Sequence, residues 1–97
     1  MKRGIIEDEV VRKALNDAEC RWNRAKDAWE AVTLVIALDP SAGTSLTESG
    51  KTRAITYQGS RSNGMPTITV IYEDHDPYLL VRDAKFSEPE KYEPYLH

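Results

Sequence analysis

The chain has 97 residues, of which 40% are hydrophobic and 30% charged, and its net charge is −3. This length suits a single domain over residues 1–97 that buries a core without staples. The acidic balance argues against a broadly basic protein that coats nucleic acid, but it is compatible with a local basic patch. Cys20 is the one cysteine, which favours a reducing compartment. No apolar run is long enough for a membrane span or a signal peptide, so we expect a cytoplasmic location.

The first forty residues carry the pattern of a helical part over residues 7–39. Eight apolar residues alternate at spacings of four and three: Val11, Leu15, Ala18, Trp22, Ala25, Trp29, Val32 and Ile36. Asp39 precedes Pro40, and a residue before proline avoids the helical region, so the helix ends there. A helix of thirty residues would be about 45 Å long. Either it breaks into a hairpin near residues 19–23 or it stays continuous. The unbroken phase of the pattern favours one continuous or gently bent helix.

The second half of the chain carries the pattern of a small sheet over residues 51–86. Ser, Thr and Gly in residues 41–50 predict a loop. Three β-rich stretches follow at residues 52–58, 67–73 and 78–86, and short connections make neighbours of this kind antiparallel. Residues 87–97 read as a loosely held tail. The expected fold class is therefore α+β, with a long N-terminal helix (or helical hairpin) packed on a three-stranded antiparallel meander.

Residues 45–52 end in Gly-Lys-Thr, as a phosphate-binding loop does. Ser45 stands where that motif requires glycine. The segment also follows a helix and opens a strand, whereas the motif follows a strand and opens a helix whose amides cradle the phosphate. We therefore predict a polar loop without a nucleotide.

Two other parts of the sequence carry reactive side chains. Residues 73–76 bring three carboxylates and His75 together, and carboxylates are ligands for Ca²⁺ or Mg²⁺. Adjacent side chains on a turn diverge, however, so a solvated turn is predicted. Cys20 lies within the helical pattern, so a semi-buried or exposed thiol is predicted and not a nucleophile. We expect no metal and no cofactor.

Two sets of residues are candidates for binding. Trp22 and Trp29 are seven residues apart on one helical face, which is typical of a core or of a subunit interface. Four cations of the sheet region are candidates for contact with a partner or a phosphate backbone: Arg53, Arg61, Arg82 and Lys85.

Residues 38–46, Leu-Asp-Pro-Ser-Ala-Gly-Thr-Ser-Leu, resemble the segment that ends the helical part of RelE/ParE-type toxins, where Asp-Pro and a Gly precede a Leu. The stretch over residues 68–73 resembles the central toxin strand, usually an aromatic-Arg-Val-x-Tyr run. Residues 78–86 resemble the strand that follows it and ends in a basic residue. The likeness covers roughly residues 32–86, and the order of helices, loop and antiparallel meander also fits.

The resemblance implies two activities. RelE-like members cut mRNA on the ribosome without a metal, using cations for the phosphate and an acid or base from His, Lys, Glu or Tyr. ParE-like members inhibit DNA gyrase, and an antitoxin that wraps the sheet and helices neutralises both. Arg53 fits the cation of the strand before the central one, Lys85 the last-strand base and Tyr92 the terminal aromatic residue. Thr69 takes the place of the central-strand Arg. The strand that opens most members is missing or reduced to residues 4–6.

Two hypotheses follow from these observations. The first is a RelE/ParE-like toxin, or a degenerate relative, that binds a protein partner such as an antitoxin, the ribosome or gyrase. Nuclease activity is doubtful in that hypothesis, because losing an Arg that stabilises a transition-state phosphate removes several kcal/mol of catalysis. The second is a non-enzymatic structural or adaptor protein that forms a homodimer through its helical part, with Trp22 and Trp29 as interface anchors.

Overall fold

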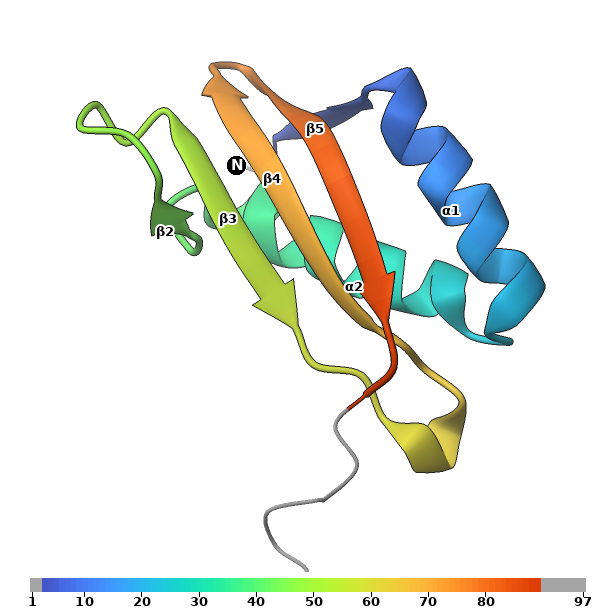
Figure 1. Ribbon diagram of the computed structural model, residues 1–97. Coiled ribbons are helices and arrows are strands. Elements are labelled where there is room, and N and C mark those ends of the chain that lie inside the picture. The colour runs from blue at the N-terminus through green and yellow to red at the C-terminus, as the bar shows by residue number, and fades with distance from the viewer. Residues whose placement is uncertain (1–2, 90–97) are drawn as a thin grey trace, which may run out of the picture.

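The computed structural model describes residues 3–89, which fold into one sheet with two helices on one of its faces (Figure 1). The helices are α1 (Glu9–Arg21) and α2 (Ala25–Leu38), and a 3₁₀ turn, η1, covers Arg61–Asn63. The strands are β1 (Gly4–Glu7), β2 (Thr44–Ser45), β3 (Thr52–Tyr57), β4 (Thr67–His75) and β5 (Tyr78–Ser87). The expected α+β class is confirmed.

The sheet has five strands in the order β1-β5-β4-β3-β2, so the prediction of a three-stranded meander is wrong. β1 runs parallel to β5, and the other neighbours are antiparallel. The two additional strands have four and two residues. Strands this short show too little alternation to be read from the sequence, and β1 pairs with a strand more than seventy residues further along.

The helical part is a pair of helices, so the prediction of one continuous helix is wrong and the hairpin alternative holds. The chain leaves α1 at Trp22, whose backbone is extended with φ −125° and ψ 131°. The apolar spacing continues across this break, because Ala18 and Ala25 on its two sides are both buried. Two separate helices can both place their apolar residues on the sheet. A single helix longer than the sheet would leave some of those residues uncovered.

The core lies between the helices and the sheet. α1 packs on β5, and α2 packs on β3, β4 and β1. Alternate residues of β4 point into this layer, as the pleat requires, and Ile68, Val70 and Tyr72 are fully buried. The rest of the core cluster is Val11, Ala28, Trp29, Val32, Ile36, Leu79, Val81 and Ala84. In Figure 1 no helix of residues 3–89 lies over the opposite face of the sheet.

Tyr72 ties the loop after α2 to the core. Its hydroxyl donates to the Pro40 carbonyl at 2.7 Å and accepts from the Gly43 amide at 3.0 Å. Gly43 is required by this close approach, since a Cβ there would lie 2.8 Å from both the Tyr72 hydroxyl and the Ala54 carbonyl oxygen. Burial raises the pKa of Tyr72 above its ordinary value, although the hydrogen bond from Gly43 opposes the shift.

Candidate protein-binding surface

The C-terminal half of α2 is apolar on the side that faces away from the sheet. Its inner face is formed by residues such as Val32 and Ile36, which have no exposed surface. On the outer side Leu34 is 48% exposed, Val35 37% and Leu38 62%. With the half-buried Ala31 these residues form what we call the apolar strip: Ala31, Leu34, Val35 and Leu38.

The spacing of the apolar strip is i, i+3, i+4 and i+7, which places the four side chains along one line of a helix. A helix that is apolar all round is normally buried by another element. Beside the strip lies a groove of about 340 Å³ lined by Ile5, Glu30, Thr33, Leu34 and Ala37. A second protein element can cover such a surface. These side chains would stabilise a complex by burying apolar area, because none of them is charged or reactive.

Arg53 is engaged inside the protein. Its Nε donates to the Gly50 carbonyl at 3.0 Å, and a terminal nitrogen donates to the Gly43 carbonyl at 2.8 Å. It pairs across the sheet with Tyr72 and so belongs to the face that the helices cover. In this position the guanidinium holds the loop between α2 and β3.

The other three predicted cations do not share a surface with Arg53. The Arg82 guanidinium lies 3.3 Å from Glu73 and 3.7 Å from Asp8. Lys85 is exposed and lies opposite Thr69 in the neighbouring strand. Arg61 belongs to η1, beyond the end of β3. The structure therefore places Arg53 and Arg61 on different elements from Arg82 and Lys85, which both lie on β5.

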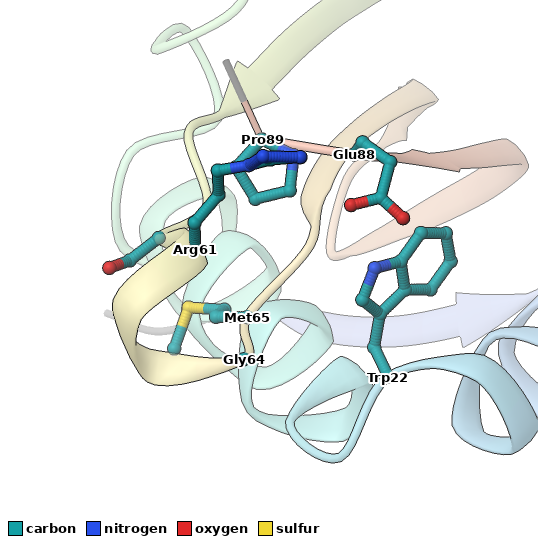
Figure 2. Close-up of a pocket in the computed structure, with 7 residues that line it drawn as sticks. Trp22, Arg61, Gly64, Met65, Glu88 and Pro89 are labelled. Carbon is teal, nitrogen blue, oxygen red and sulfur yellow. The ribbon is translucent and has the colours of Figure 1, made fainter. Parts of the chain in front are cut away.

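The two tryptophans have different surroundings. Trp29 is 9% exposed and packs in the core cluster, so little of it is available to a second subunit. Trp22 is half-buried, with the Arg21 guanidinium 4.5 Å from its ring centroid. Figure 2 shows it on one side of a cavity of about 280 Å³, with Arg61 and Pro89 across from it. Tyr92 lies outside the described residues.

The acidic stretch expected to be a solvated turn belongs largely to β4. Residues 73–75 are in the strand, and the turn is reduced to Asp76 and Pro77. Glu73 and His75 point to the same side, and the His75 Nε2 lies 2.8 Å from a Glu73 carboxylate oxygen. This contact, with Arg82 nearby, holds the pKa of Glu73 below its ordinary value. The alternation of a strand continued through residue 75 was the signal that could have revealed the pair.

The His75 ring also stacks on Tyr78, with centroids 5.4 Å apart. The group is a short polar network on the open face of the sheet, with each charged member paired. Within residues 3–89 no three His, Cys, Asp or Glu side chains are grouped as a metal site requires. In the same residues no helix is long and apolar enough to cross a membrane.

The apolar strip is the candidate that the sequence argument missed. Leu34, Val35 and Leu38 are not among the eight regularly spaced apolar residues of the helical part. Their own helical spacing was the signal in the sequence. A scan against models of protein families finds no match for the chain, and a search of curated proteins finds none either.

Proposed function

We propose that this chain is a RelE/ParE-like protein, or a degenerate relative, that acts by binding a protein partner through the apolar strip. The observation that carries the binding role is the exposure of Leu34, Val35 and Leu38 on a helix whose other face is already buried. The family part is supported by β1, because most RelE/ParE members also open with a strand. The pair of helices and the antiparallel run β3-β4-β5 follow it in the order the resemblance implies.

Phosphate chemistry has weaker support. The resemblance implies that Thr69 replaces the central-strand Arg. The guanidinium of Arg53 donates to the carbonyls of Gly43 and Gly50. Arg82 is paired with Glu73. Lys85, which lies opposite Thr69 in the neighbouring strand, is exposed. We therefore propose binding as the mode of action and do not propose nuclease activity.

The contribution of the strip can be estimated from its exposure. Full burial of a Leu or Val side chain is worth about 1.5–3 kcal/mol. Side chains that are about half exposed would regain about 1 kcal/mol each, hence about 3 kcal/mol for Leu34, Val35 and Leu38 together. That corresponds to a change in affinity of about a hundredfold.

The test is induction of the protein in bacterial cells, with assays of growth, mRNA cleavage and gyrase activity. We expect growth arrest, and we expect its loss in the double variant Leu34→Asp, Leu38→Asp. Val10→Asp is the matched control, because Val10 is 55% exposed and lies on α1. Normal growth, intact mRNA and active gyrase with the wild-type protein would reject the toxin proposal. Growth arrest that the double variant retains would reject the strip as its surface.

A second candidate function is an adaptor that dimerises through the helical part, and the exposed strip is the observation that favours it. The mass in solution distinguishes the two. A dimer that Leu38→Asp converts to a monomer supports the adaptor. A wild-type monomer at high concentration removes it. Trp29→Asp is unsuitable as the test, because Trp29 is a core residue and its loss would unfold the protomer.

A further inference from the structure

The segment that carries the apolar strip is acidic. Residues 27–50 contain four carboxylates and no Lys or Arg. The carboxylates are Asp27, Glu30, Asp39 and Glu48. The same segment carries Leu46, which is 54% exposed. Exposed apolar side chains and negative charge are therefore combined on one part of the chain.

Lys26 and Lys51 flank this segment, and Lys26 precedes Glu30 by one turn of α2. Three arginines near the segment are engaged in contacts, one of them with Asp27 of the segment itself. The backbone amide of Arg3 donates to the Ala37 carbonyl. The Arg3 guanidinium lies 2.5 Å from the Asp74 carboxylate. Arg53 donates to backbone carbonyls, and Arg24 binds Asp27 at 2.7 Å near the start of α2. The carboxylates of Glu30 and Asp39, both exposed, remain at the two ends of the strip.

The shape of the strip suits a helix. Four side chains at i, i+3, i+4 and i+7 occupy about two turns, about 10 Å of α2. A partner helix that packs alongside would present apolar residues at the same spacing. Cations flanking those residues would meet Glu30 and Asp39.

A second copy of the chain fits less well. Two copies of the strip would bring acidic segments together, which costs free energy. A stable dimer also needs about 20–30 residues on each side, far more than the four of the strip. A short helix of another protein requires only the strip and its rim.

We infer that the apolar strip binds an amphipathic helix of another protein, with Lys or Arg residues flanking its apolar face. This inference rests on the proposed function, because it names the chemistry of the partner. The strip supplies the contact area, and the acidic segment selects a basic helix over an acidic one.

The test uses two synthetic peptides of about 18 residues, long enough to hold a helix. Both carry Leu at i, i+3, i+4 and i+7. One has Lys at the flanking positions and the other has Glu. Binding to the full chain is followed by fluorescence anisotropy at low salt. We expect the basic peptide to bind at least about tenfold more tightly, with the difference shrinking near 1 M salt, where screening acts over about 3 Å.

Variants locate the site. Leu38→Asp should weaken binding of the basic peptide about tenfold or more, and Val10→Asp should not change it. Glu30→Lys should weaken the basic peptide and strengthen the acidic one, whereas Glu19→Lys, an exposed position on α1, should affect both peptides less.

Equal binding of the two peptides, no binding by either, or unchanged binding by Leu38→Asp would overturn the inference. A concentration-dependent wild-type dimer that Leu38→Asp dissociates would also overturn it in favour of a second copy. Growth arrest that depends on Leu34 and Leu38, with no preference for the basic peptide, would leave the proposed function intact and remove this inference alone. Failure of both tests would remove both.

Discussion

The hydroxyl of Tyr72 offers a direct test of how the loop after α2 is held. Tyr72→Phe removes one atom that serves two backbone groups, the Gly43 amide and the Pro40 carbonyl. The ring remains, so the core keeps its volume. Each lost hydrogen bond is worth about 1 kcal/mol, and a buried donor left unpaired costs about 1–3 kcal/mol. Gly43 is buried, so we expect a total loss of about 2–3 kcal/mol of unfolding free energy.

Urea denaturation followed by circular dichroism measures this loss as a lower midpoint with an unchanged slope. For a domain of this size the melting temperature should fall by about 10–20 °C. Tyr57→Phe is the matched control, since Tyr57 is a half-buried tyrosine of β3 whose hydroxyl makes no hydrogen bond to the described residues. A loss below about 0.5 kcal/mol in Tyr72→Phe, or an equal loss in both variants, would refute the anchoring role of the hydroxyl.

Four further outcomes are expected. Gly59→Ala should fold poorly or lose several kcal/mol, because its Cβ would overlap the backbone of Met65 and Pro66; expression level and melting temperature report this. Arg53→Ala should free the loop around Gly43, seen as faster amide exchange there than in the wild type. Glu73→Gln should cost stability near neutral pH but not in acid. The folded-state pKa of Glu73 is lowered, so its contribution is present above its unfolded pKa of 4.5 and is lost as pH falls through the folded value; urea midpoints against pH measure this. At the alkaline end the raised pKa of Tyr72 predicts stability that declines above pH 10.0 in the wild type but less in Tyr72→Phe.

Part of the candidate surface was within reach of the sequence. The i, i+3, i+4 and i+7 spacing of the strip is visible in residues 31–38, as is the absence of cations from residues 27–50. The sequence does not show whether another part of the same chain covers Leu34 and Leu38, because that depends on where β1 and the loops lie. The fold shows which apolar face remains open, and this decides the candidate surface.

The contacts of the four cations, unlike the spacing of the strip, were not visible in the sequence. Four positive residues in one stretch favoured a common contact face, since the sequence cannot tell which side chains are already engaged. In the structure Arg53 is bound to backbone carbonyls and Arg82 lies between Glu73 and Asp8. These contacts depend on how the loop before β3 folds and on which elements lie beside β5, and a charge count carries no information about them.

The sequence by itself determined what local periodicity encodes. The burial of Val11, Val32 and Ile36 followed from the helical spacing, and that of Ile68, Val70 and Tyr72 from strand alternation, because each regular element turns a fixed set of positions to one side. Tertiary structure alone decided the break at Trp22, the parallel pairing of β1 with β5 and the contact between Arg82 and Asp8. These features depend on which distant segments meet in the closed fold. The free energy that fixes them comes from packing and pairing between elements, which the pattern within one element does not contain.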